Sequence, residues 1–198
     1  MAGKFLDSLW GTEYTDKLRQ IASRLDQIEV DRTRVKPTVK VTGEFWAQTT
    51  EGDGNFNMFR FLEREGAQVQ VEPVGTFLTY IIHQAKQKTR DRLGIDERGA
   101  GAWRLRLGAT LKQQRLLAAL TLAETLFKRE WRRLRRALNN IPHDLTDQYE
   151  LQRLWHPFYN SRAGGGEGYM EVAKNIYYHN KDLCHMVLSL KPFGCMPS

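Results

Sequence analysis

A strand, loop, helix and second strand follow one another between residues 37 and 75, and this pattern constrains the fold more than any other feature. Thr38–Thr42 and Ala67–Glu72 alternate as strands do, whereas residues 56–65 repeat apolar side chains at helical spacing. Two strands joined through a helix within about forty residues form a βαβ unit, whose strands run parallel with a right-handed crossover. The sequence therefore predicts an α/β fold with a small parallel sheet.

The loop after the first predicted strand, Gly43–Asn55, is the first candidate site. Open parallel sheets bind ligands beyond the carboxyl ends of their strands, and this loop exceeds the usual length of about 2–6 residues. Its candidate ligand-binding residues are Glu44, Glu51, Asp53 and Asn55, and the three carboxylates could include an acid/base pair. The alternative is a surface loop in which Asp53 or Asn55 caps the following helix.

A second candidate site is the glycine-rich loop at residues 160–168, which leads into a predicted helix from Tyr169 to about Asn180. Glycines let the backbone approach a ligand closely, and the helix dipole adds positive potential. The residues expected to bind an anion, such as a phosphate or a carboxylate, are Ser161, Arg162, Gly164, Gly165 and Gly166. The loop lacks the endings of a P-loop and of a dinucleotide fingerprint, and a flexible connection is the competing interpretation.

Residues 77–154 are expected to form a helical hairpin inserted into the α/β lobe. That lobe comprises residues 28–76 and 155–198, and an N-terminal helical segment, residues 1–27, precedes it. In sequence order, the hairpin would be followed by the last strand of the lobe, Met186–Leu190.

The second helix of this hairpin is predicted from Trp103 to Leu138. Its apolar residues form a heptad-like seam, made of Leu116, Leu120, Ala123, Phe127, Trp131, Leu134 and Leu138. We expect the seam to pack against the helix at residues 77–93, because that amphipathic partner belongs to the same chain. A homo-oligomer formed through residues 103–138 is the alternative.

The positive charge is local. The net charge is +7, and Lys128–Arg136 alone contributes six basic residues against one Glu. No aromatic platform or recognition-helix pattern accompanies this run, which disfavours nucleic acid as a partner. We expect at most a role in docking another protein.

Composition indicates a cytoplasmic protein. Of the 198 residues, 41% are hydrophobic, enough for a sizeable core, and no apolar run approaches the roughly 18 residues that span a membrane. A signal-peptide pattern is not evident at the amino terminus. The two cysteines are expected to be thiols, Cys184 buried on a helix end and Cys195 just beyond the last strand.

Three kinds of cysteine chemistry remain open. Cys195 could be a nucleophile with His156, His179 or His185 as its base. Cys184, His185 and Cys195 could contribute to a zinc site, although the paired short spacing of structural zinc is absent. An iron–sulfur cluster needs about three or four thiolates, so this chain alone could not complete one.

Three segments give the chain a family resemblance: Gly43–Asn55, Asn160–Gly168 and Ser189–Ser198. They resemble the acyl-CoA dehydratase activase-related proteins, whose corresponding region is similar to the iron–sulfur subunits of 2-hydroxyacyl-CoA dehydratases and benzoyl-CoA reductases. The resemblance extends from about Ile28 to Ser198. It implies Rossmann-like α/β lobes and ATP-driven, low-potential electron transfer toward thioester substrates.

By this resemblance, Cys195 matches one cysteine ligand of a 4Fe-4S cluster. The ATPase domain and the earlier cysteine-bearing lobe of the family are missing, so we expect a fragment or a reduced relative. Another chain or lobe would supply the remaining cysteines, and acyl-CoA or phosphate is the expected ligand. The alternative from a different class is a non-catalytic scaffold that docks through the long basic helix.

Overall fold

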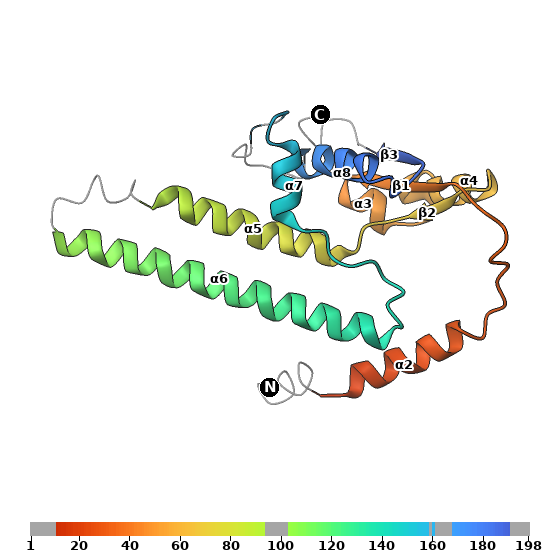
Figure 1. Ribbon diagram of the computed structural model, residues 1–198, viewed down its shortest axis with the longest axis horizontal. Helices are drawn as coiled ribbons and strands as arrows, with labels where there is room; N and C mark the ends of the chain where they lie inside the picture. The colour runs from red at the N-terminus through yellow and green to blue at the C-terminus, as the bar shows by residue number, and fades with distance from the viewer. Residues whose placement is uncertain (1–10, 94–102, 159, 161–167, 191–198) are drawn as a thin grey trace. The chain divides into compact units, whose positions relative to one another are not determined.

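The computed structural model describes residues 11–93, 103–158, 160 and 168–190 (Figure 1). Within these residues the chain forms seven α-helices, one short 3-10 helix and a three-stranded sheet. It divides into two compact units. The sheet unit comprises Val30–Glu72 and Thr146–Ser198, and the helical unit comprises Met1–Glu29 and Pro73–Leu145.

All described strands of the sheet run parallel. The strands are β1 (Thr38–Gly43), β2 (Gln68–Gln70) and β3 (Met186–Leu190), in the order β2-β1-β3. Val39 pairs with Val69 on one side of β1, and Gly43 pairs with Leu190 on the other. The predicted α/β fold with a parallel sheet and a helical insertion is confirmed, and β3 spans the residues that were expected.

One face of β1 is apolar because alternate side chains of a strand point to opposite faces. Val39 and Val41 pack there with Leu62 of helix α4 (Met58–Arg64) and with Ala67. Val41 is fully buried, and burial of one such side chain stabilises the fold by about 1.5–3 kcal/mol. Gly66, at φ +88°, follows α4 in a left-handed turn, a conformation that glycine adopts without strain.

The opposite face of β1 is polar. Lys40 and Thr42 are both fully buried there, and helix α8 (Gly168–Asn180) supplies polar partners. The Thr42 hydroxyl donates a hydrogen bond to Asn175 Oδ1 at 3.0 Å. Next to it, the Ser189 hydroxyl of β3 donates to Glu171. This sheet therefore has one hydrophobic face and one hydrogen-bonded face.

Helix α7 (Gln148–Trp155) completes the sheet unit and packs on α8 through stacked aromatic rings. Trp155 is fully buried, and its ring centroid lies 4.3 Å from that of Tyr169. At the other end of α7, the Asp147 carboxylate accepts the backbone N–H of Tyr149 at 3.0 Å and caps the helix.

In the helical unit, α5 (Val74–Arg92) and α6 (Trp103–Ala137) form the expected hairpin (Figure 1). A buried ion pair joins them, with Lys86 Nζ 2.7 Å from Glu124 Oε2. Helix α2 (Glu13–Leu25) also packs on α6. No helix in the described part of the chain is both long and apolar enough to cross a membrane.

Candidate functional site

Strands β1 and β3 end together at the edge of the sheet where a ligand site was expected. The backbone N–H of Glu44, the first residue after β1, donates to the carbonyl of Leu190 at 2.9 Å. Gly43 occupies this edge at φ +104°, and a Cβ there would lie 2.1 Å from the Leu190 oxygen. Only glycine allows the two strand ends to approach so closely.

The loop that follows is folded into two short helices. Helix α3 (Phe45–Thr49) and the 3-10 helix η1 (Gly52–Asn55) occupy most of the span that was predicted to be a loop. The Gln48 side-chain amide donates to the Gly43 carbonyl at 2.8 Å and fastens α3 to the strand end.

The expectation that Asp53 or Asn55 caps the next helix is wrong. Helix α4 begins after Asn57, which makes no side-chain capping bond. The reason is local backbone geometry. Phe56 and Asn57 both adopt left-handed conformations, at φ +58° and +53°, so Asp53 and Asn55 lie upstream in η1.

Two of the four predicted loop residues are buried and carry side-chain polar atoms that have no hydrogen-bond partner among the described residues. Glu44 is 9% exposed and Asn55 is fully buried. Neither Oε1 of Glu44 nor either amide atom of Asn55 has a partner among the described residues. An unsatisfied buried polar group costs about 1–3 kcal/mol, and such groups in a folded protein call for an explanation, such as a bound molecule.

The other two loop residues, Glu51 and Asp53, are exposed. Asp53 Oδ1 accepts a long hydrogen bond of 3.4 Å from the Asn57 amide. Both of these carboxylates face solvent. Of the four predicted loop residues, only Glu44 and Asn55 are buried.

The second predicted loop and the predicted metal ligand lie outside the described residues. These residues are Ser161, Arg162, Gly164, Gly165, Gly166 and Cys195. The described start of α8 carries a carboxylate in its first turn, since Glu171 is buried there against Ser189. A carboxylate at a helix N-terminus already interacts favourably with the helix dipole.

The sequence analysis missed a buried ionic cluster on the polar face of the sheet. Lys40 Nζ lies 2.8 Å from Glu72 Oε2 and 4.4 Å from the ring centroid of Tyr178. The Tyr178 hydroxyl donates to Glu72 Oε2 at 2.7 Å, and the Thr146 hydroxyl donates to Glu72 Oε1 at 2.7 Å. With Lys174, which is 3% exposed, these residues form what we call the Glu72 cluster.

Charge and burial shift the pKa values of this cluster in defined directions. Burial alone would raise the pKa of Glu72, but the charges of Lys174 and Lys40 and the hydrogen bonds from Lys40 and Thr146 lower it to about 2. Burial lowers the pKa of Lys40, although Glu72 opposes this shift. Burial, followed by the negative charge of Glu72, raises the pKa of Tyr178. Glu72 is therefore ionised in the folded protein.

One sequence signal could have identified this cluster. Lys40 lies between two valines in a strand that alternates β-branched residues, and a lysine inside a buried strand needs a paired charge. Its partners could not have been read from the sequence, because Glu72 and Tyr178 are distant along the chain.

The expected buried position of Cys184 on a helix end is wrong. Cys184 is half-buried and lies in the connection between α8 and β3. Beside it, His185 Nδ1 accepts the backbone N–H of Thr38 at 3.0 Å. Both residues are at the amino end of β3. They therefore lie at the opposite end of β3 from Leu190, about 17–20 Å away at roughly 3.3 Å per strand residue.

The other candidate bases are exposed. His156 ends α7 and His179 lies in the last turn of α8, and both face solvent. Among the residues that the structure describes, no three His, Cys, Asp or Glu side chains gather as a metal-binding group.

The geometry defines an α/β protein whose candidate site lies at the carboxyl ends of the strands of a parallel sheet, and whose sheet carries a buried ionic cluster on its polar face. Comparisons with protein-family models, with curated proteins and with solved structures find no match to this chain.

Proposed function

We propose that this chain is part of an iron–sulfur redox lobe related to the acyl-CoA dehydratases and their activases, and that it acts in the cytoplasm. In this role it takes part in ATP-linked, low-potential electron transfer toward thioester substrates. One observation carries the proposal: Glu44 N donates to Leu190 O at 2.9 Å, so the strand that leads toward Cys195 ends against the Gly43–Asn55 loop. The buried, unpartnered groups of Glu44 and Asn55 add support.

The thiols of this chain fit one ligand position, not a whole cluster. An all-cysteine 4Fe-4S cluster takes about four thiolates, and the chain has two cysteines. Cys184 precedes β3 at the amino end of that strand, and the family resemblance matches Cys195, not Cys184, to a cluster ligand. Another chain or lobe would supply the other thiolates, and the bound cluster would supply one-electron chemistry at low potential.

Anaerobic reconstitution with iron, sulfide and excess dithiothreitol, whose thiolates stand in for the ligands of the other chain or lobe, tests this proposal. We expect iron and sulfide to be retained after desalting, together with visible absorbance, and we expect Cys195→Ser to lose most of both. Cys184→Ser is the matched control and should behave like the unmodified protein. Equal loss in both variants, or no retained sulfide in the unmodified protein, would refute the assignment of Cys195.

A second candidate function rests on the exposed leucines of α6. Leu111, Leu122 and Leu126 are 51%, 60% and 47% exposed, and a large contiguous apolar surface marks a site of interaction with another protein. The chain would then be a scaffold that associates with itself through residues 103–138. Light scattering on the Leu122→Glu variant tests this idea. If Leu122 lies in a self-association interface, the substitution should shift the monomer–oligomer equilibrium toward the monomer.

The basic run is a weaker basis for such docking. Lys128 pairs with Glu124 at 2.5 Å, and Arg133 pairs with Glu130 at 2.6 Å. Arg135 Nε donates to the Pro142 carbonyl at 2.7 Å. These three cations are paired inside the helical unit. Association through α6 should therefore be weakened more by substitution of the exposed leucines than by added salt.

A further inference from the structure

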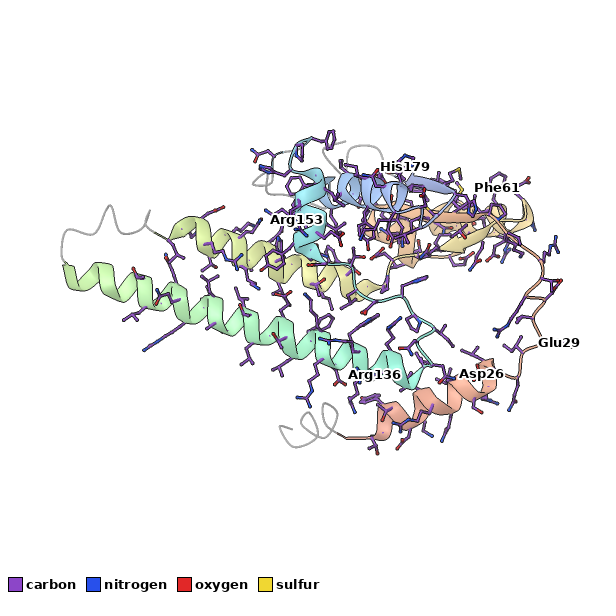
Figure 2. The ribbon with its side chains drawn as sticks, in the orientation of Figure 1. Asp26, Glu29, Phe61, Arg136, Arg153 and His179 are labelled. Atoms are coloured by element: carbon purple, nitrogen blue, oxygen red, sulfur yellow. The ribbon has the colours of Figure 1, made fainter. Side chains whose placement is uncertain are left out.

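Two phenylalanines stand exposed on the sheet unit beside the candidate site. Phe56 is 80% exposed and Phe61, on α4, is 56% exposed. Phe61 is labelled in Figure 2. They line a hollow of about 450 Å³. The complete lining is Phe56, Asn57, Arg60, Phe61, Arg64 and Glu65.

The backbone holds Phe56 outward at a cost in strain. Its φ of +58° lies in the left-handed region, which costs a residue with a side chain roughly 1–2 kcal/mol. Asn57 adopts the same conformation, and its N–H donates to the Gly52 carbonyl at 2.7 Å. Strain of this kind persists where the surrounding structure enforces it, and it is concentrated at functional positions.

Two arginines complete the surface. Arg60 and Arg64 are both exposed and lie four residues apart on α4, so they share one helix face. Neither has an ion-pair partner in the described part of the chain. Arginine and phenylalanine are both enriched in protein–protein interfaces, and arginine is among the residues that dominate their energetics.

We propose that Phe56, Arg60, Phe61 and Arg64 form a docking surface for a protein segment that presents an apolar side chain next to one or two carboxylates. The two guanidinium groups complement the carboxylates, and the rings receive the apolar side chain. Glu65 at the rim limits how much negative charge the surface accepts.

Exposure and charge argue against the other occupants. A small-molecule site encloses about 70–90% of its ligand, whereas the rings here remain mostly open to solvent. A nucleic-acid strand carries a phosphate about every 3.4 Å. The lining offers two cations against one carboxylate, which favours a partner with few negative charges.

The test is selection of a random-peptide phage library on the 198-residue chain. We expect the enriched peptides to share an aromatic or leucine residue adjacent to Asp or Glu. Synthetic peptides made from that consensus should lose at least about tenfold in affinity for the Arg60→Glu/Arg64→Glu variant, which corresponds to about 1.4 kcal/mol. Arg129→Glu/Arg136→Glu makes the same charge change on exposed residues of α6 and is the matched control.

Phe56→Gly separates docking from folding. Glycine adopts the left-handed conformation without strain, so this variant should fold with unchanged or higher stability and still lose peptide binding. The proposal is overturned if no peptide is enriched more strongly on the unmodified chain than on the Arg60→Glu/Arg64→Glu variant. It is also overturned if the consensus lacks the acidic and apolar pair, or if Phe56→Gly binds normally. Competition by a nucleotide or an oligonucleotide, rather than by peptide, would assign the surface to that ligand instead.

Discussion

The Thr146 hydroxyl donates a 2.7 Å hydrogen bond to Glu72 Oε1, and both side chains are buried. Glu72 is the last residue of the sheet unit before Pro73–Leu145, and Thr146 is the first residue after it. The two ends of the long helical insertion are therefore joined by side chains inside the sheet unit. Lys40 and Tyr178 attach the same carboxylate to β1 and α8.

The Glu72 cluster should make folding stability sensitive to acid. The pKa of Glu72 is lowered from 4.5 to about 2, so the unfolded chain binds the proton more tightly than the folded protein does. Ionised Glu72 therefore stabilises the fold fully above about pH 5, and this contribution is lost as the pH falls toward 2. A shift of this size corresponds to about 3 kcal/mol of unfolding free energy.

Urea unfolding of Glu72→Gln at several pH values between 7 and 3 checks this contribution. The variant should be less stable at pH 7 and should lose less stability on acidification than the unmodified protein. Glu51→Gln removes an exposed carboxylate from the same unit and should leave the acid dependence unchanged. If the unfolding free energies of the unmodified protein and of Glu72→Gln fall equally on acidification, ionised Glu72 does not stabilise the fold as proposed.

Tyr178 and its neighbour Tyr177 provide a second test. Tyr178→Phe keeps the ring below Lys40 Nζ but removes the 2.7 Å hydrogen bond to Glu72. We expect a loss of about 1.5–3 kcal/mol in unfolding free energy, as for hydrogen bonds to charged groups. Tyr177→Phe, on the more exposed side of α8, should cost less than about 1 kcal/mol. Similar losses from both substitutions would mean that the hydroxyl of Tyr178 is not specially bound.

The sequence was sufficient for the elements whose signals are local. Alternation predicted β1 and placed β3 at Met186–Leu190, because a strand pattern depends on neighbouring residues only. The parallel pairing of β1 with β2 followed from the helix between them. Glu44 and Asn55 were predicted as candidate site residues, which stays a prediction, and the structure shows that both are buried.

The remaining features depend on contacts that no local pattern encodes. In the Glu72 cluster, Tyr178 contacts Glu72 although it lies 106 residues further along the chain. Only the tertiary structure brings these side chains together. The helical spacing of residues 56–65 did not predict that α4 starts only after Asn57. Phe56 and Asn57 both adopt left-handed backbone conformations, and such conformations are rare for residues other than glycine. Cys184 is half-buried, not buried on a helix end, because it lies in the connection between α8 and β3, four residues beyond Asn180.

Gly43 should tolerate no side chain. A Cβ at this position would lie 2.1 Å from the Leu190 oxygen, and φ is +104°. Gly43→Ala should therefore separate the ends of β1 and β3 and cost more than about 3 kcal/mol in unfolding free energy. Gly52 is the matched control, because its φ is +79° but nothing lies within 4 Å of its Cβ position. Gly52→Ala should cost only the backbone strain, about 1–2 kcal/mol. Equal costs in chemical denaturation would show that the two strand ends can separate easily.

Asn55 should be a residue whose removal does not weaken the fold. Its amide is fully buried and has no hydrogen-bond partner among the described residues, so Asn55→Leu removes an uncompensated desolvation cost of about 1–3 kcal/mol while keeping a similar shape. We expect unchanged or higher unfolding free energy for Asn55→Leu. The same substitution at Asn175 deletes the acceptor of the Thr42 hydroxyl and should destabilise the protein by about 1–3 kcal/mol. If Asn55→Leu destabilises as much as Asn175→Leu, the Asn55 amide has a partner such as ordered water. If Asn55→Leu leaves the unfolding free energy unchanged or raises it, Asn55 lowers the stability of the folded protein. A destabilising residue in the candidate site is expected where function, and not folding, maintains the side chain.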